Sequence, residues 1–236
     1  MITVVIPTSP SIVNPDTSII DQAITSVKEY FPTSKIMVTF DGVRKELRHH
    51  TDRYEKFKYA MLEKYSGDLE MIMYSNHEHQ SGMMFDTLQR IDTDQLFYME
   101  HDWILSGEIP IEAMSKTISE GTADLIRVLY PTELPSYYMD MMVDQTPQIV
   151  NGIPLTRTFQ WSQNPHLAST EFYRRIMNDH FKPNQRSFIE NGLNSIVSQA
   201  YREQGWGKFK TFIYVPEGNT QRCIHLDGRK GEQHDF

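Results

Sequence analysis

Short apolar runs alternate with longer segments whose apolar residues recur at helical spacing through the first 130 residues. The first run, residues 2–7, does not alternate between apolar and polar positions, so we expect it to be buried on both faces of a sheet. This pattern favours a mostly parallel sheet with helices on both faces. The expected strands are residues 2–7, 35–40, 69–74, 96–99 and 124–129, and the expected helices are about 17–30, 45–65, 82–91 and 110–120.

The second half of the chain is less regular. Residues 130–138 are rich in proline and tyrosine, which is typical of a loop, and residues 149–161 predict a hairpin with Asn151-Gly152 at its turn. Helices are expected at 168–181 and 188–203, followed by a strand at 211–215. The polar tail that follows is expected either to lack fixed structure or to fold over a bound ligand.

The composition fits a soluble α/β protein. A chain of 236 residues with 39% hydrophobic residues can form one large domain or two small ones with a sizeable core. Its apolar runs are too short to span a bilayer, and its first residues lack the basic region of a signal peptide. With Cys223 as the single cysteine, no internal disulfide can form, so we expect a reducing compartment, the cytoplasm.

The net charge of −8 makes nucleic acid a less favoured acceptor or partner, because an acidic surface repels phosphates. Basic residues concentrate in the segment 44–58, where acidic residues interrupt them. This pattern favours a solvated helix face. A positive spot for a diphosphate or an acidic acceptor is the alternative.

Polar residues follow the expected strands at the points where those strands end. Ligands of an open parallel sheet collect at the carboxyl ends of its strands, so these residues predict a single crevice. Asp41-Gly42 is also ordinary turn chemistry, which is the alternative for Asp41. The strand-end residues are Thr8, Ser9, Asp41, Asn76, Glu100 and Asp102.

The triplet Glu100-His101-Asp102 is the sharpest chemical feature. Two carboxylates near one point repel each other unless a cation lies between them, and oxygen ligands suit Mg²⁺ or Mn²⁺. Such an ion would bridge the phosphates of a nucleoside diphosphate and stabilise the charge on the leaving group. The alternative is an exposed acidic turn. His77-Glu78-His79 lacks the helical spacing of a transition-metal site, so we do not assign one there.

Four segments together resemble GT-A glycosyltransferases, especially family-2-like ones: residues 2–8, 23–27, 40–42 and 97–102. The resemblance implies a metal-dependent transfer of sugar from a nucleotide-sugar donor. It implies that Thr8 and Asp41 contact the nucleotide base and that Glu100 and Asp102 bind the metal and the ribose. Because Glu100 stands where the family usually has aspartate, Asp102 is the expected main metal ligand. The expected donor-binding set is Pro7, Thr8, Ser9, Asp41, Asn76, Glu100 and His101.

The second half adds weaker matches to the same family. Glu190 lies where many members place a catalytic carboxylate at the start of a helix, and it is the candidate general base that draws the proton from an acceptor hydroxyl. The alternative is that the helix dipole favours a glutamate there. The family also suggests that His225 completes the metal site. The expected acceptor contacts are Trp161, Asn164 and Trp103, although core packing is the alternative for both tryptophans.

We therefore expect an α/β fold of the GT-A-like (Rossmann-like) type, with a mostly parallel sheet flanked by helices in a single domain. Residues 1–130 would form the donor half, and residues 131–236 the acceptor half with a C-terminal flap. The expected donor is a nucleotide sugar, UDP-linked by family frequency, and the expected acceptor is a hydroxyl of a glycan, a lipid-linked sugar or a small molecule. Inversion with Mn²⁺ or Mg²⁺ is expected. The alternatives are a sugar-1-phosphate nucleotidyltransferase and a non-catalytic nucleotide- or glycan-binding module.

Overall fold

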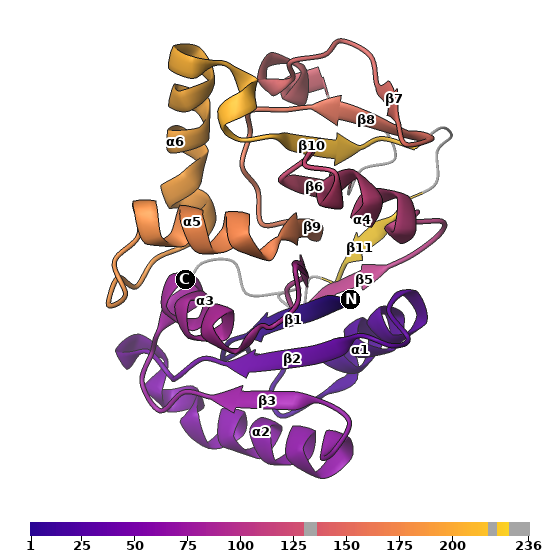
Figure 1. The fold of residues 1–236 in the computed structure, drawn as a ribbon. Helices are drawn as coiled ribbons and strands as arrows, with labels where there is room; N and C mark the ends of the chain where they lie inside the picture. Colours follow the sequence, from indigo (N-terminus) through magenta and orange to yellow (C-terminus); the bar gives the residue numbers. More distant parts are fainter. Residues whose placement is uncertain (130–135, 217–220, 227–236) are drawn as a thin grey trace.

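The computed structural model describes residues 1–129, 136–216 and 221–226 and shows one central sheet of nine strands (Figure 1). The strands in chain order are β1 (Ile2–Thr8), β2 (Lys35–Phe40), β3 (Glu70–Met73), β4 (Gln95–Tyr98), β6 (Leu125–Val128), β7 (Gln148–Val150), β8 (Ile153–Arg157), β9 (His166–Ser169) and β10 (Thr211–Tyr214). Their order across the sheet is β3-β2-β1-β4-β9-β6-β10-β8-β7.

The sheet is mostly parallel, as the alternation of strands and helices predicted. Strands β3, β2, β1 and β4 run in one direction, and β6 and β10 are parallel to each other. Strand β9 is antiparallel to both β4 and β6, and β8 is antiparallel to β10 and β7. The hairpin expected around Asn151-Gly152 is confirmed as β7 and β8, and Asn151 adopts a positive φ of 51° at its turn.

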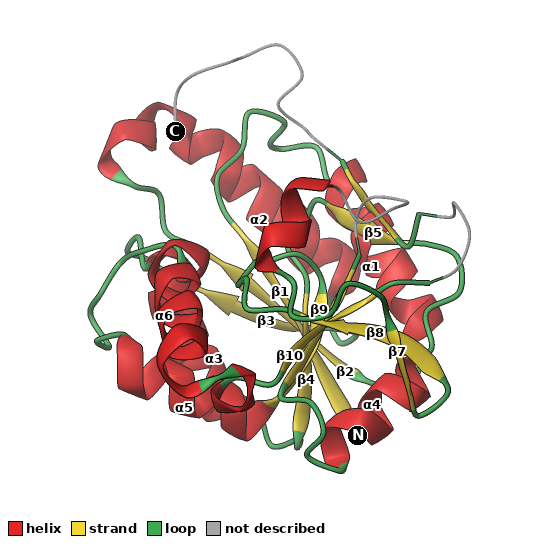
Figure 2. Ribbon diagram, turned by 90° about the horizontal axis from the view of Figure 1, so that it is seen from above, coloured by secondary structure: helices red, strands yellow, loops and turns green. Residues whose placement is uncertain are grey.

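Helices cover both faces of the sheet, and alternate strand residues face the two layers. Val4 and Ile6 pack with α1 (Ser18–Tyr30), α2 (Thr51–Tyr65) and α4 (Ile111–Ser119). Val5 packs with α3 (His79–Arg90), α5 (Thr170–His180) and α6 (Ile189–Gln204). Figure 2 shows the second group gathered on one side of the twisted sheet and α1 and α4 on the other. The first strand is therefore buried on both faces, as expected.

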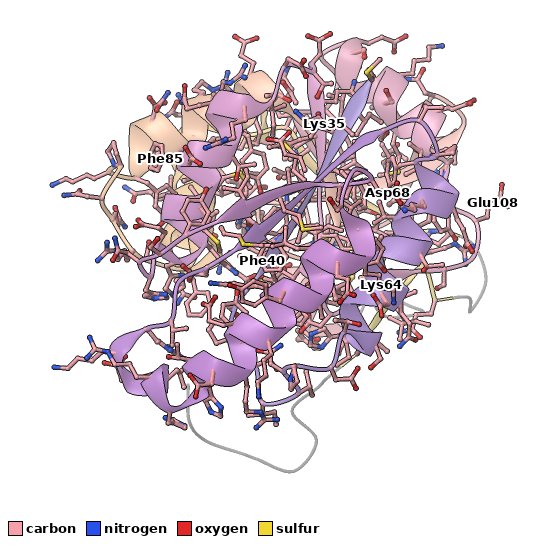
Figure 3. The ribbon with its side chains drawn as sticks, turned by 90° about the horizontal axis from the view of Figure 1, so that it is seen from below. Lys35, Phe40, Lys64, Asp68, Phe85 and Glu108 are labelled. Carbon is pink, nitrogen blue, oxygen red and sulfur yellow. The ribbon has the colours of Figure 1, made fainter. Side chains whose placement is uncertain are left out.

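The layer between the sheet and α2 is filled by side chains. Phe40, labelled in Figure 3, is fully buried. Its ring centroid lies 6.0 Å from that of Phe57 on α2. Just after β2, Gly42 packs against the main chain of Asn76, where a Cβ atom would lie 2.2 Å from the Asn76 carbonyl carbon. Only glycine permits this close approach, which brings the loops after β2 and β3 together.

Several element boundaries differ from the sequence-based expectation. The helix expected from residue 168 begins at Thr170, because residues 166–169 form β9, and the Ser169 hydroxyl caps the helix by accepting from Phe172 N. The helix expected over 45–65 is divided into a 3₁₀ turn, η1 (Lys45–His50), and α2. Part of the 130–138 loop is the 3₁₀ turn η2 (Ser136–Met141). Residues 130–135 and the expected flap at 227–236 lie outside the described residues.

A second, two-stranded sheet joins distant parts of the chain. Strand β5 (Trp103–Leu105) follows the acidic triplet and pairs antiparallel with β11 (Cys223–His225). In this register His225 stands opposite Trp103, so the pairing brings the C-terminal segment 223–226 next to the acidic triplet; Figure 1 shows β11 beside β5. Within the described residues, no helix is both long and apolar enough to cross a membrane.

Candidate active site

The carboxyl ends of β1, β2 and β4 meet at a cavity of about 250 Å³. Residues from η1, the start of α3 and Phe188 complete its walls. Asn76 is exposed and does not line this cavity; its main chain supports Gly42 instead. The cavity-lining residues that the sequence singled out are Pro7, Thr8, Ser9, Asp41, Glu100, His101 and Asp102.

Asp41 is only 2% exposed, and its carboxylate is occupied by its own surroundings. It accepts hydrogen bonds from the backbone N–H groups of Gly42 (2.8 Å), Glu78 (2.7 Å) and His79 (3.1 Å), and His77 Nδ1 lies 2.8 Å from Oδ2. Burial raises the pKa of Asp41, and these donors oppose the shift. Because a carboxylate has about four acceptor positions, contact with a base would require one of these donors to move. In this arrangement Asp41 holds the loop that begins α3.

That loop contributes residues the sequence reading did not assign to the site: His77, His79 and Gln80 all line the cavity. The Nδ1 atom of His79 accepts from Gln80 N at 2.8 Å, which leaves the imidazole proton on Nε2. Burial lowers the pKa of His79 to about 4, with further lowering by the charges of His77 and Arg44. His79 is therefore neutral near pH 7. In the sequence, the only sign that these three residues belong to the site is their position after the third expected strand.

Asp102 is held by the C-terminal segment. Its Oδ2 atom lies 3.1 Å from His225 Nε2, and its carbonyl accepts from Leu226 N at 2.7 Å. Burial acts to raise the pKa of Asp102, but the hydrogen bond from His225 and the charges of His101 and His225 outweigh it, so the pKa is lowered. Asp102 is therefore ionised at neutral pH.

The residues around Asp102 fit a divalent cation that the protein coordinates only in part, so that a bound ligand and water complete its shell. Its Oδ1 atom is buried and has no hydrogen-bond partner among the described residues. The part of the chain that the structure describes contains no cluster of three or more His, Cys, Asp and Glu side chains able to hold a metal. Mg²⁺ is usually held by one or two carboxylates, with phosphates and water completing the shell. Asp102, with His225 Nε2 3.1 Å from its Oδ2 atom, matches this incomplete type of site, and Glu100 lines the same cavity.

Glu190 lies in the first turn of α6, two residues after the cavity-lining Phe188. Its Oε2 atom accepts hydrogen bonds from Gln163 N at 2.8 Å and from the Ser162 hydroxyl at 3.2 Å. These two donors come from the segment between β8 and β9, so they fix the carboxylate to a separate part of the fold. Glu190 does not itself line the cavity.

The two tryptophans expected to bind sugar belong to the core. Trp161 is 2% exposed and donates from Nε1 to Gln163 Oε1 at 2.8 Å, while Trp103 is 6% exposed and packs against the His225 ring at 4.7 Å. Their burial favours core packing, the alternative stated for both residues, over stacking on a sugar. Asn164 is half-buried beside Ser162, whose hydroxyl lies 3.4 Å from Asn164 N. A contact between Asn164 and the acceptor stays a prediction.

A buried histidine lies beneath this segment. His166 is fully buried, with Nδ1 2.7 Å from the Asn164 carbonyl and Nε2 2.7 Å from the Tyr173 hydroxyl. These partners fit a neutral ring that donates from Nδ1 and accepts at Nε2. Burial lowers the pKa of His166 to about 4, assisted by the charge of Arg127 and opposed by the bond to Asn164.

We expect His166 to make the protein less stable in acid. Its pKa is about 6.5 in the unfolded chain and about 4 in the fold, so between these values only the unfolded chain binds the proton. The free energy of unfolding therefore falls as the pH is lowered through this range, by about 3 kcal/mol in total at about 1.4 kcal/mol per pH unit. Urea titrations at pH 7 and pH 4.5 should show a smaller pH-dependent loss in His166→Gln than in the wild type. The exposed control His49→Gln should retain the wild-type loss, and parallel behaviour of all three proteins would contradict the assignment.

Solved structures resemble this chain over nearly its whole length. TarS residues 1–349 from S. aureus superposes with a TM-score of 0.54 at 13% identity, covering 92% of this chain and 58% of that chain. The mannosyltransferase PcManGT from Pyrobaculum calidifontis, in complex with GDP-Man and Mn²⁺, gives a TM-score of 0.58 at 10% identity, covering 98% and 58%. The bifunctional IspDF from Campylobacter jejuni gives a TM-score of 0.50 at 12% identity, covering 94% and 51%.

At these identities the likeness establishes the fold alone. The chain has a single-domain, GT-A-like α/β fold with a mostly parallel sheet flanked by helices, which confirms the predicted fold class. It spans 58% of the TarS and PcManGT chains. No protein-family model and no curated protein matches the sequence.

Proposed function

We propose that the protein is a metal-dependent glycosyltransferase that takes a sugar from a nucleoside-diphosphate sugar. The observation that carries the proposal is the meeting of Thr8, Asp41 and the Glu100–Asp102 triplet at one cavity, with His225 brought to Asp102 from the far end of the chain. On a GT-A-like sheet this is the edge where ligands bind. The Mn²⁺ and GDP-Man in the PcManGT complex support the same class of ligand.

The geometry of the cavity and the family resemblance support the following roles. Asp102 and His225, with Glu100 at the same cavity, would hold Mn²⁺ or Mg²⁺, and the bound ion would neutralise charge on the leaving diphosphate. Pro7, Thr8 and Ser9 form the cavity wall at the end of β1, where the nucleoside would lie. We assign the donor half to residues 1–130 and the acceptor half to the remainder. UDP is the proposed nucleotide, by family resemblance.

Glu190 is the proposed general base. In a single displacement, the acceptor oxygen forms a bond to the anomeric carbon while the bond to the diphosphate breaks, and Glu190 takes the hydroxyl proton. The configuration of the sugar is inverted in such a reaction. Ser162 and Gln163 would hold the carboxylate in place through the hydrogen bonds to Oε2.

A nucleotidyltransferase is the less favoured alternative. It would need a glycine-rich, basic loop after the first strand to bind a triphosphate, whereas the cavity wall there is Pro7-Thr8-Ser9-Pro10-Ser11. A non-catalytic nucleotide-binding module shares the proposed cavity and differs only in lacking turnover.

The direct test is nucleotide binding to the wild-type protein. UDP, GDP, CDP and ADP are added with and without Mn²⁺, and the melting temperature is measured. We expect one nucleotide to stabilise the protein only with metal. At a 100-fold excess over Kd the gain is about 2.7 kcal/mol, and each kcal/mol raises Tm by about 2–4 °C for a chain of this size.

Donor hydrolysis separates the three candidate functions. Turnover of the matching nucleotide sugar supports the transferase, binding without turnover indicates the module, and turnover only of a nucleoside triphosphate indicates the nucleotidyltransferase. Absence of any metal-dependent shift with every nucleotide would contradict the proposal.

A further inference from the structure

Helix α6, which carries Glu190, begins without a cap of its own. Its N-cap residue is Phe188, whose side chain cannot accept a hydrogen bond. The first N–H groups of a helix have no partner within the helix and need one from elsewhere. The acceptor for Ile189 N is Gln80 Oε1 at 3.2 Å, contributed by the first turn of α3.

The other end of the same amide reaches the acidic triplet. Gln80 Nε2 donates to Glu100 Oε1 in a short hydrogen bond, and Gln80 and Glu100 both line the cavity. The two neighbours fix the orientation of the amide, because an N–H group needs the oxygen and a carboxylate needs the NH₂. Gln80 thus connects the strand-end carboxylate to the start of α6.

Further contacts join the same two segments. The Ser81 hydroxyl donates to the Gln185 carbonyl at 2.7 Å and accepts from Ser187 N at 3.0 Å. The His79 ring meets the exposed Phe188 ring edge-on at 4.3 Å. The start of α3 is in turn held by Asp41 through the backbone of residues 78 and 79. The segment before α6 is therefore attached to the donor side of the cavity by a continuous set of contacts.

We infer that Gln80 is a positioning residue that ties Glu100 to the N-terminus of α6 and so sets the place of Glu190 relative to a bound donor. The inference rests on the proposed function. Turnover is sensitive to displacements of about 1 Å between the acceptor oxygen and the anomeric carbon. A side chain that bonds both Glu100 and the start of α6 therefore affects turnover without reacting itself. A carboxylate cannot replace the amide because it has no N–H donor for Glu100, and an ammonium group cannot replace it because it has no acceptor for Ile189 N.

The test compares Gln80→Leu, which loses both bonds, with Gln80→Glu, which keeps an acceptor for Ile189 N and loses the donor to Glu100. Gln80 is only partly buried, so both variants are expected to fold. The matched control is Gln199→Leu, because Gln199 makes a similar 2.7 Å bond to Glu203 on the exposed side of α6.

Amide hydrogen exchange provides a readout that does not depend on activity. In Gln80→Leu the Ile189 amide should exchange at least about 10-fold faster than in the wild type, since its acceptor is lost. In Gln199→Leu it should remain close to the wild-type rate. In Gln80→Glu the rate should rise less than in Gln80→Leu, because the carboxylate is repelled by Glu100 but can still accept from Ile189 N. Unchanged exchange at Ile189 in Gln80→Leu would overturn the inference even if the protein proved to have no transferase activity.

Kinetics with the donor identified by the nucleotide panel provide the second readout. Gln80→Leu should lower kcat by about 10–100-fold, the range found for outer-shell partners, and change the donor KM by less than about 3-fold. Added to Glu190→Gln, it should lower kcat by less than about 3-fold more, because residues that act as a unit are not additive. A full, additive loss in the double variant, or a change in KM alone, would overturn the positioning role. Failure of the wild type to bind any nucleotide would instead reject the proposed function.

Discussion

Replacing Glu190 with glutamine is expected to lower kcat for sugar transfer by about 10²–10⁴-fold, the usual contribution of a general base. The substitution keeps an oxygen for the bonds from Gln163 N and the Ser162 hydroxyl and removes only the proton acceptor. Because Glu190 does not line the cavity, nucleotide binding should be unchanged. Initial rates of donor consumption with acceptor present, and calorimetry with the nucleoside diphosphate, measure the two quantities separately.

The matched control is Glu171→Gln. Glu171 is an exposed glutamate in the first turn of α5, so its charge interacts with a helix N-terminus as that of Glu190 does, but it lies in a different helix. This variant should keep the wild-type kcat. If Glu190→Gln also retains kcat within about 3-fold, Glu190 is a helix-dipole residue and another group must act as the base.

Replacing Asp102 with asparagine is expected to remove metal-dependent nucleotide binding and to lower kcat/KM by about 10²–10³-fold. Losses of that size follow when a pre-organised electrostatic contact to a developing charge is removed. Asparagine keeps the shape and an acceptor for His225 but lacks the charge that a cation needs. The measurements are the Mn²⁺ dependence of kcat/KM and the thermal shift with nucleotide and Mn²⁺.

Asp179→Asn is the control for this experiment, since Asp179 is an exposed aspartate of α5 that does not line the cavity. It should behave as the wild type in both measurements. If Asp102→Asn keeps the Mn²⁺-dependent thermal shift, the cation is held elsewhere, and Asp102 serves to hold the C-terminal segment through His225 and Leu226.

Local pattern was sufficient for the parallel strands of the first half of the fold. The strands at residues 2–7 and 35–40 were predicted because buried parallel strands are continuous apolar runs bounded by turns. Strand β9 was missed: residues 166–169 form a short run directly before a helix, and their strand character comes from pairing with β4 and β6 on either side. The start of α3 at His79 was also missed, because the loop there is shaped by hydrogen bonds to Asp41, a residue far away in the sequence.

Part of the candidate site could likewise be predicted from the chain. Thr8, Asp41 and Glu100 follow strands that were expected to be parallel, and the carboxyl ends of neighbouring parallel strands must meet at one edge. What a side chain does at that edge was not predictable. Asp41 has its acceptor positions occupied by backbone donors, and Trp161 fills the core, and both outcomes depend on neighbours that sequence spacing does not show.

The sequence by itself thus determined the α/β class, the mostly parallel sheet and the edge at which strand-end polar residues gather, since periodicity and apolar runs are local properties of the chain. Only the tertiary structure decided which distant residues join them. His225 reaches Asp102 through the pairing of β11 with β5, and Gln80 at the start of α3 bonds to Ile189 at the start of α6. These contacts form when the whole core is packed, so no short segment of the sequence contains the information that specifies them.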